Sequence, residues 1–564
     1  MSLLLAQVIA PPLQNGPVRL PGSGAAEERP VRPGTGDSPL QLGPGLESPG
    51  STTAPPSTSA PPGSDTKLPV VEGLQRYSAE ALHQILGPCA AIRDPAERLR
   101  RCAADLTARL MRDGYVNTRV YVRPTPAPGS LLVVEGRIVE IRVITDDTWL
   151  QRRVQRLLAP LQGRVLHLPS LEQDLRLLAR APGIGQLRAN LSRLGSDPAQ
   201  GVLTVRMEGA RLPWQGEISI RNDGTSGSGD ARAVATALKP DLISRGDLLL
   251  VYGEVDGTTA PRFGSLISSV SYTLPLAPRW NVTGAFGVSR RNLIELPAPA
   301  DGFASTQVQG LGQLEWVMQD TLRQRWSLAA AFSGNRSNTF FNGSPLPVSE
   351  PASVRMPTNG YLRLGINGSG SGQQMAWNAG AFLLQGVAAT TPADQRQELA
   401  RVGLYPGEAR ALGALVGASW LLSPTWQLNV RAAGQVALAP LTSPMRFTLG
   451  SDTGLRGLPG QLVSGDNGWL GTAELVWTVW QKRQQAVQLV PFVGAGGVGT
   501  SLTSLNRATN DTVGSGGILA RWLAGRAWTL ELGWVNQFAT QNNPGPWQNW
   551  ALGQGLYGKV QYRF

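Results

Sequence analysis

Few side chains of this sequence could carry out chemistry. Its two histidines, His83 and His167, lie far apart in segments whose pattern predicts helices, and we interpret both as surface or hydrogen-bonded helix residues. Neither a Ser-His-Asp order, nor a metal-ligand cluster, nor a phosphate-binding Gly-Lys loop can be built around them. The glycine-rich run 494–499 resembles a dinucleotide-binding loop, but it lacks a βαβ unit with a downstream acid. We therefore expect no enzyme, no catalytic residue, no bound metal and no cofactor.

The two cysteines could form a disulfide. Cys89 and Cys102 fall at the end of one expected helix and within the next. In a cytosolic protein such a pair would be free thiols in the core. In an exported domain a disulfide between the helices is favoured, and it would close a loop worth roughly 3 kcal/mol.

Length and charge narrow the class of protein further. A chain of 564 residues should contain more than one folding unit. The net charge of +12 comes from 47 Arg and 4 Lys that are scattered and carry no DNA- or RNA-binding signature, so we expect no nucleic-acid partner. No run of about 18 consecutive apolar residues occurs, so any membrane span would have to be a β-barrel.

The last nine residues indicate the strand from which such a barrel would be built. Successive side chains of a strand point to opposite faces, so alternation gives one apolar and one polar face. A soluble sheet produces this pattern, and so does a transmembrane strand of about 9–11 residues. The first face would carry Leu556, Gly558, Val560, Tyr562 and Phe564, and the second Tyr557, Lys559, Gln561 and Arg563.

Sixteen alternating segments, separated by turn residues, occupy residues 210–564. Fifteen of the sixteen tryptophans lie at or after Trp214, many of them at expected strand ends. Trp is enriched at membrane interfaces, because its ring is apolar and its N–H can reach water. We therefore predict a 16-stranded antiparallel transmembrane β-barrel in contact with outer-membrane lipid, with 14 or 18 strands as alternatives. A soluble all-β domain is the less favoured interpretation.

The first 65 residues are expected to contribute little structure. Residues 1–10 contain a short apolar run without preceding basic residues, which we interpret as the remnant of a truncated signal peptide, with a disordered N-terminus as the alternative. Residues 11–65 contain 13 Pro and 9 Gly and no aromatic residue, so they cannot bury enough apolar surface to offset the entropy lost on ordering. This composition predicts a flexible, disordered linker.

Two similar α+β units are predicted between the linker and the barrel, over residues 66–136 and 137–209. Each has the order β-α-α-β-β. In the first unit, Ser78 and Asp94 precede amphipathic helices as N-caps. In the second unit, we expect Thr148 and Ser170 to open the helices.

This arrangement resembles the two-partner secretion outer-membrane transporters of the TpsB type, the haemolysin and filamentous-haemagglutinin secretion proteins of the BamA superfamily. Residues 115–121 look like part of the family's first POTRA domain, and residues 132–138 look like the junction between its two POTRA domains. Residues 171–191 look like part of the second. Residues 222–229 and 247–248 look like the first barrel hairpin. The resemblance covers about residues 66–564 and implies two α+β POTRA domains followed by a transmembrane barrel.

The most specific match is the stretch 449–458, followed by 465–468. It resembles the superfamily's Val-Arg-Gly-Phe/Tyr signature, which is carried by a long loop, here about residues 436–468, that folds back into the barrel lumen. The resemblance places Arg456 inside the barrel, where it would hold this loop to the barrel wall. The residues of the motif are Gly454, Leu455, Arg456, Gly457 and Leu458.

The facing strand departs from the family pattern. The family usually has Phe-x-Asp-x-Gly, whereas Phe492, Gly494 and Gly496 fill these positions here, so a glycine replaces the acid. An unpaired guanidinium in a narrow lumen is costly and needs acceptors. We expect Asp466, Glu474 or backbone carbonyls to accept from Arg456.

The resemblance implies an outer-membrane translocase with its POTRA domains in the periplasm. These domains would bind a large, unfolded, β-helical exoprotein of the TpsA type by adding a strand to a sheet edge, and the barrel would export it without ATP. Terminal Tyr562 and Phe564 are expected to be the signal that the barrel assembly machinery uses for insertion. We expect docking in the second POTRA domain, around Leu171, Leu175, Leu178, Leu187 and Leu191.

Two other membrane functions are alternatives. A BamA-like β-barrel assembly factor would carry the same Arg-Gly loop, but such factors usually have more POTRA domains. A diffusion porin would lack the loop signature and would leave the α+β units unexplained. The two units, the Pro-rich extension and the first-hairpin match favour secretion.

Overall fold

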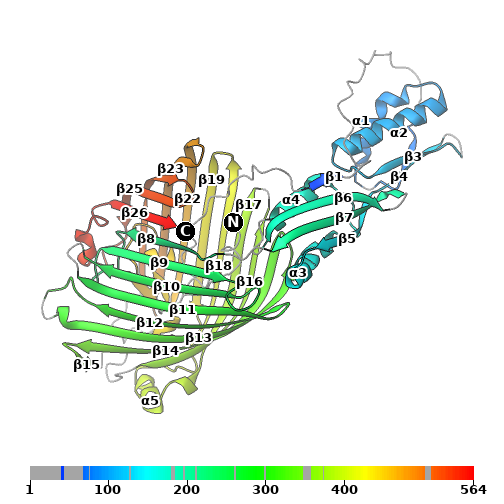
Figure 1. The fold of residues 1–564 in the computed structure, drawn as a ribbon. Helices are drawn as coiled ribbons and strands as arrows, with labels where there is room; N and C mark the ends of the chain where they lie inside the picture. Colours follow the sequence, from blue (N-terminus) through cyan, green and yellow to red (C-terminus); the bar gives the residue numbers. More distant parts are fainter. Residues whose placement is uncertain are drawn as a thin grey trace. The chain divides into compact units, whose positions relative to one another are not determined.

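The computed structural model describes residues 40–42, 68–74, 76–125, 129–179, 184–194, 197–209, 213–258, 262–297, 300–346, 357–372, 374–501 and 510–564. The chain divides near residue 211 into two compact units. The first unit contains the two α+β domains, and the second is the β-barrel (Figure 1).

The first α+β domain follows the order expected from the sequence. Its elements are β2 (Val70–Glu72), α1 (Ala79–Ala90), α2 (Pro95–Arg112), β3 (Arg119–Arg123) and β4 (Ser130–Val134). The sheet order is β2-β4-β3, with β2 parallel and β3 antiparallel to β4. Ser78 and Asp94 cap the helices as expected: the Ser78 hydroxyl accepts from Ala81 N, and the Asp94 carboxylate accepts from two amides of the first turn.

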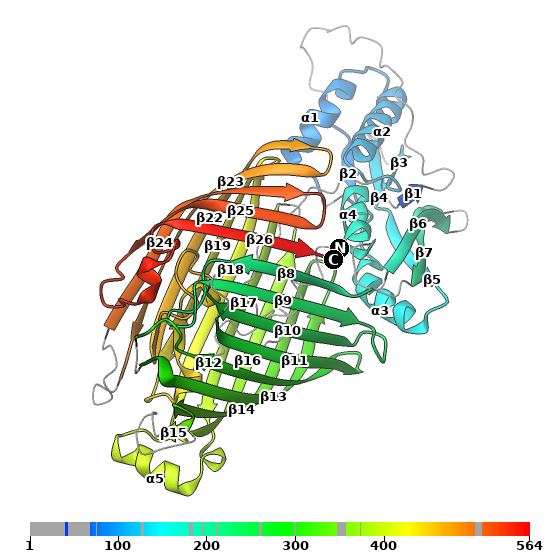
Figure 2. The ribbon, with the colours of Figure 1, turned by 60° about the vertical axis from the view of Figure 1, so that its left-hand side comes forward.

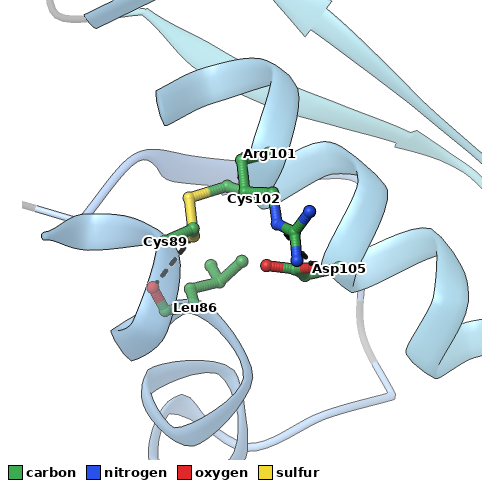
Figure 3. The surroundings of a disulfide bond; sticks show 5 residues. All are labelled: Leu86, Cys89, Arg101, Cys102 and Asp105. Atoms are coloured by element: carbon green, nitrogen blue, oxygen red, sulfur yellow. Dashed lines mark hydrogen bonds and ion pairs between the residues drawn. A yellow bond between two sulfur atoms is a disulfide. The ribbon is translucent and has the colours of Figure 1, made fainter. Parts of the chain in front are cut away.

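A disulfide joins the two helices of this domain. Cys89 at the end of α1 is bonded to Cys102 in α2, with 5.3 Å between their Cα atoms (Figure 3). Both cysteines are buried in the core that Leu86 and Leu106 share. The bond therefore ties α1 to the helix that covers the sheet.

The second α+β domain repeats the same order. Its elements are β5 (Arg137–Ile144), α3 (Thr148–Leu158), η1 (Ala159–Leu161), α4 (Leu168–Ala179), β6 (Ile184–Leu194) and β7 (Asp197–Gly209). Both expected caps need correction. Asp147, one residue before Thr148, accepts from Trp149 N and Leu150 N because its carboxylate reaches both amides. Ser170 lies inside α4, where its hydroxyl contacts His167 instead of opening the helix.

One strand of this sheet comes from the linker. β1 (Leu40–Leu42) runs parallel to β6, so the sheet order is β1-β6-β7-β5. The prediction of a wholly disordered segment over residues 1–65 is therefore wrong at these three residues. Leu40 is buried in the domain core, and its strand pairs with β6. These two contacts provide the stabilisation that the Pro- and Gly-rich segment lacks by itself. The rest of residues 1–65 lies outside the described residues.

The two α+β domains contact each other through the segment 113–117. Asn117 is fully buried and donates its amide to the carbonyl of Ala199 on β7 at 3.2 Å. His167 Nε2 lies 3.1 Å from the carbonyl oxygen of Asp113, and the imidazole packs against Tyr115. His167 therefore joins the domains, a role that its position in the sequence does not reveal.

The second unit is a closed antiparallel barrel of sixteen strands, as predicted (Figure 2). A three-residue strand, β15 (Ser344–Leu346), adds to β14 and is not counted. Each alternating segment of the sequence coincides with one strand; most strands extend further, and only the terminal segment ends one residue beyond its strand. The strands are β8 (Gln215–Arg221), β9 (Ala231–Pro240), β10 (Leu248–Gly257), β11 (Phe263–Ala277), β12 (Trp280–Asn292), β13 (Phe303–Asp320), β14 (Gln324–Phe341), β16 (Thr358–Ser371), β17 (Met375–Gly386), β18 (Arg410–Ser423), β19 (Trp426–Ala437), β22 (Asn467–Lys482), β23 (Gln485–Gly499), β24 (Asn510–Ala524), β25 (Trp528–Phe538) and β26 (Leu556–Arg563).

The two faces of the barrel differ in polarity. On β26, Leu556 and Val560 are exposed on the outer face, whereas Lys559 and Gln561 are buried on the inner face. Aromatic pairs cross neighbouring strands on the outer face, including Trp280–Trp316, Trp426–Trp477 and Trp528–Tyr562. An apolar exterior with paired aromatic residues suits contact with lipid. Among the described residues, no helix is long and apolar enough to cross a membrane.

Candidate functional site

The candidate site is the loop that joins β19 to β22. It contains η4 (Ser443–Met445), β20 (Phe447–Leu449), η5 (Ser451–Thr453) and β21 (Val463–Gly465), and β20 and β21 form a small hairpin. Phe447, Leu449, Leu455 and Leu458 are fully buried against side chains of the inner barrel face. The loop therefore lies inside the lumen and has its own apolar core there.

Glycines let the loop turn close to the wall. Gly457 has φ +81°, a left-handed conformation that favours glycine. A Cβ at this position would lie 2.2 Å from Cγ1 of Val535 on β25. The backbone approaches the wall so closely that any other residue at position 457 would have to move the loop inward.

Arg456 projects from this turn into a cluster of charges on the wall. Its Nε donates to Glu474 on β22 at 2.8 Å, and its Nη1 donates to Glu531 on β25 at 3.0 Å. Glu531 also accepts from Arg521 on β24 at 2.5 Å. We call Arg456, Glu474, Glu531 and Arg521 the Arg456 cluster. Two carboxylates face two guanidinium groups, so the charges balance.

Of the two acceptors expected from the sequence, Glu474 contacts Arg456 and Asp466 does not. Asp466 lies at the base of the loop, directly before β22, at 3.7 Å from Arg446, and accepts from the amide of Ser501. Glu531 was missed, because no spacing rule relates β25 to a loop 75 residues earlier. Only the closure of the barrel brings the two together.

Gly494, which replaces the family's acid, leaves room for a side chain of the loop. A Cβ at Gly494 would lie 3.1 Å from Cδ2 of Leu455 and 3.1 Å from Cγ2 of Thr472. Leu455 therefore packs where the acid would project in the family pattern. In this chain the acids that bind Arg456 come instead from β22, which neighbours β23, and from β25, which lies two strands away. Phe492 and Gly496 flank the position on β23, and Gly496 lies against Leu449 in the same way.

The main chain of the loop is also held by the wall. The Ser515 hydroxyl on β24 donates to the carbonyl of Arg456 at 2.5 Å, and the Gln537 amide on β25 donates to the carbonyl of Gly457 at 3.0 Å. These bonds place the Arg456 backbone independently of its charge. A variant at Arg456 would therefore loosen the turn without removing every contact.

A second cluster of charged residues binds the loop to β9. Here the loop supplies the carboxylate and the barrel wall supplies the guanidinium group. Arg232 on β9 is fully buried and pairs with Asp256 on β10 at 2.8 Å and with the loop residue Asp452. Glu254 lies 3.5 Å from the same guanidinium, and the Thr225 hydroxyl accepts from it at 2.7 Å. We call Arg232, Glu254, Asp256 and Asp452 the Arg232 cluster. The alternation of the strands places Arg232, Glu254 and Asp256 on the inner face of the barrel. No pattern in the sequence predicts that this group contacts Asp452.

The two clusters lie on either side of the seam where β26 meets β8. The seam has five register pairs, Lys559–Arg563 against Glu217–Arg221, fewer than any other neighbouring pair of the sixteen strands. Phe564 and Gly216 extend it by two backbone hydrogen bonds of 3.1 Å. The Asn222 side chain extends it at the other end by bonding the backbone of β26. The loop thus connects β9 with β22 and β25 across the shortest pairing of the barrel.

The remaining residues singled out in the sequence are placed as follows. Leu171, Leu175, Leu178 and Leu191 form the core of the second α+β domain, with Leu187 packed beside them, so their side chains hold α4 to the sheet and do not line an open groove. Tyr562 and Phe564 lie on the outer face of the barrel at the seam. Among the described residues, no group of three or more His, Cys, Asp or Glu side chains could hold a metal ion.

Comparison with known families gives this geometry a context. Residues 201–517 match the family described as haemolysin secretion/activation protein ShlB/FhaC/HecB, a match that covers more than half of the chain. The chain belongs to this family. It is therefore a two-partner secretion transporter of the TpsB type, and the family match favours secretion over barrel assembly.

Individual relatives agree with this assignment. The outer membrane transporter CdiB of Dickeya dadantii (strain 3937) is 22% identical in an alignment of 407 residues that covers 68% of this chain and 67% of the relative. CdiB from Escherichia coli has a similar fold, with a TM-score of 0.60 at 16% identity over 91% of this chain and 93% of that one. CdiB from Acinetobacter baumannii gives a TM-score of 0.52 at 14% identity over 91% and 94%. This ShlB/FhaC/HecB family member is thus an outer-membrane protein, and its family implies a secreted partner.

Proposed function

We propose that the chain binds an unfolded exoprotein with its α+β domains in the periplasm and exports it through the barrel without ATP. The observation that carries this proposal is the polar inner face of the barrel, occupied by a loop that charge clusters hold in place. A lumen lined by charged and amide side chains suits an extended polypeptide, whose backbone needs hydrogen-bonding partners. No nucleotide is available in the periplasm, so the client's folding outside the cell supplies direction.

The α+β domains are the proposed docking surface. A sheet edge presents unpaired N–H and C=O groups, so an extended chain can add to it with little demand on its sequence. The outer side of β6 in the second domain, of which β1 covers only residues 189–191, is the favoured site. Since Leu171, Leu175, Leu178 and Leu191 are buried, contact there runs through the backbone of β6.

The loop must move, or leave a path beside it, for a client to pass. Both clusters are largely buried, and breaking a buried ion pair by removing one partner costs about 3–5 kcal/mol. A client that binds the displaced state of the loop more tightly than its resting state can supply this free energy. The partner proposed here is a large β-helical exoprotein of the TpsA type, and the barrel assembly machinery inserts the transporter itself.

Deletion of residues 66–209 tests the docking role. We expect secretion of the proposed exoprotein partner to be lost from cells that carry the deletion. The barrel should still reach the outer membrane, which heat-dependent migration on a gel and membrane fractionation can verify. Secretion that persisted with a correctly inserted barrel would contradict the proposal.

A further inference from the structure

Three arginines stand on the outer, mostly apolar face of the barrel. Arg290 on β12, Arg336 on β14 and Arg410 on β18 are exposed. Strand alternation puts each of them on the same face as exposed apolar neighbours, such as Val288 beside Arg290 and Leu412 beside Arg410. β12 to β18 follow one another around the wall (Figure 2), so the three charges share one side of it.

The proposed orientation places all three arginines near the extracellular end of the barrel. β8 begins directly after the second α+β domain and therefore starts at the periplasmic end. Because the strands alternate in direction, β12 and β14 run away from the periplasm and β18 runs back towards it. Arg290 lies close to the end of β12, Arg336 lies in the last third of β14, and Arg410 is the first residue of β18.

The strand register shows that the three arginines lie at the same height. The register row that starts at Trp280, at the periplasmic end of β12, reaches Trp469 at the extracellular end of β22, so rows climb in this direction. With strands about 4.8 Å apart, a rise of about 3.4 Å per residue and a tilt of about 40°, all three arginines lie about 26 Å above Trp280. This height is close to the roughly 25 Å of the apolar band of such barrels. The arginines therefore lie at the level of the lipid headgroups.

These cations occupy only one side of the barrel. In the extracellular half of β22 to β26 and of β8 to β11, none of the described strand residues that face outward is an arginine or lysine. No outward-facing Asp or Glu accompanies the arginines on the described strands from β12 to β19. Arginines that only anchored the barrel at the interface would be expected around the whole perimeter. The grouping indicates a negatively charged ligand on this side.

An apolar groove crosses the same side of the barrel. It has a volume of about 1240 Å³ and extends from Trp280 to Trp469. Small residues of one register row form its floor, and aliphatic side chains of the next row form one wall. The floor contains Ala381, Ala414 and Gly434, and the wall contains Leu383, Leu412 and Val436. Leu412 lies two residues from Arg410 on the same face of β18, so the groove adjoins one of the cations.

Gln385 on β17 holds this cation in place. Arg410 Nε donates to the side-chain oxygen of Gln385 at 2.6 Å. The Gln385 amide in turn donates to the carbonyls of Gly386 and Gly407 at 2.9 and 2.7 Å. The bond to Gln385 uses Nε, and the two terminal nitrogens of a guanidinium can bind a phosphate side by side. A side chain ordered in advance loses less entropy when a ligand binds.

We propose that this side of the barrel binds a phosphorylated glycolipid of the outer leaflet, the lipid A part of lipopolysaccharide. Arg290 and Arg336, whose Cα atoms are about 12 Å apart by register, converge on one phosphate. Arg410 binds a second phosphate, and acyl chains lie in the groove. The bound lipid holds the wall opposite the seam of β8 and β26. The inference uses the proposed orientation but no step of client docking, so its test and the export tests can fail separately.

Lipid binding to the purified full chain in detergent tests the site. The probes are bisphosphorylated lipid A, dephosphorylated lipid A and phosphatidylglycerol, with the bound fraction measured by native mass spectrometry. We expect Arg290→Gln, Arg336→Gln and Arg410→Gln together to weaken binding of bisphosphorylated lipid A at least about tenfold, because charge-assisted contacts are lost. The triple substitution Arg279→Gln, Arg483→Gln, Arg526→Gln makes the same change of charge at exposed turns of the periplasmic end and should bind as the unsubstituted chain does.

A second variant tests the groove without changing the charge. Ala414→Phe fills the floor and should also weaken binding of bisphosphorylated lipid A. Ala520→Phe, at an exposed outward position of β24, is the matched control and should not. Heat-dependent migration on a gel verifies that each variant is folded.

The lipid probes decide whether the headgroup is recognised. The unsubstituted chain should bind dephosphorylated lipid A and phosphatidylglycerol at least about tenfold more weakly than bisphosphorylated lipid A. Equal binding of either probe would overturn the inference, because phosphates on a glycolipid would then not be selected. Equal binding of bisphosphorylated lipid A by the arginine variant and its control would overturn it as well.

Discussion

Arg456 is the residue on which the loop contacts converge. The motif around it could be identified from the sequence, and so could the need for acceptors and one of them, Glu474. Glu531 could not, because its contact depends on which strands the closed barrel brings together. Asp466 was a reasonable candidate by proximity in sequence, but it lies beside Arg446 at the base of the loop.

Arg456→Ala should cut export by at least about tenfold while the barrel still inserts. The substitution leaves Glu474 and part of Glu531 without their cation, and removing one partner of a buried pair costs about 3–5 kcal/mol. Secreted exoprotein and heat-dependent migration of the barrel are the two measurements. Arg279→Ala, at an exposed turn, is the matched control and should export normally. Unchanged export by Arg456→Ala would show that the loop's charge is dispensable.

Gly494→Asp tests whether the family's acid can be restored. The new side chain would collide with Leu455, whose Cδ2 is 3.1 Å from the position of the Cβ. We therefore expect lower thermal stability of the barrel and weaker export, even though an acid has been added near Arg456. Adding Leu455→Ala should recover stability in part, because it vacates that space. If Gly494→Asp alone were neutral or stabilising, the packing explanation for the glycine would be wrong.

The sequence predicted the helices and strands more accurately than the side-chain contacts. All sixteen barrel strands and both β-α-α-β-β units could be located, because alternation and helical periodicity reflect one buried face per element. Strand lengths were underestimated, because the alternation of apolar and polar residues fades where the hairpins extend beyond the apolar band of the barrel. β1 was missed because a strand of three residues carries no periodic signal and depends on pairing with β6.

The loop is a single element held at two points, so its second anchor should matter independently of Arg456. Asp452→Asn removes the loop's carboxylate from the Arg232 cluster but leaves Arg232 paired with Asp256. We expect a partly loosened loop and a larger or noisier ion conductance in planar bilayers. Asp320→Asn, at an exposed strand end, should conduct like the unsubstituted chain. Identical conductance for Asp452→Asn would mean that the Arg232 cluster only stabilises the wall.

The disulfide between α1 and α2 should stabilise the first α+β domain. Replacing both Cys89 and Cys102 with serine should lower the free energy of unfolding of this domain by roughly 3 kcal/mol, since it frees a short loop in the unfolded chain. Limited trypsin digestion of the full chain can measure this, because α2 is rich in arginine. Cleavage within the second domain, which has no disulfide in its described part, serves as the internal reference. Equal cleavage of α2 with and without the bond would exclude this role.

The order of strands around the barrel explains why the loop has two anchors. β8 and β26 are the ends of the barrel sequence and form its shortest pairing. The loop binds β9 through Asp452 and β22 and β25 through Arg456, so it spans the seam from inside. Such a connection requires a closed barrel, and no pattern within one segment of the sequence could have revealed it.

A cross-link across this seam distinguishes export through the lumen from passage through a lateral opening. Ser219 and Gln561 are register partners on β8 and β26, and both are buried on the inner face. Cysteines at these two positions should form a disulfide that holds β8 to β26, and each single substitution is the control. Because the client is proposed to thread the lumen, the linked barrel should export at the rate of the single variants. Export that is lost on oxidation and restored by reduction would require β8 and β26 to separate during transport, as barrel assembly by strand templating also would.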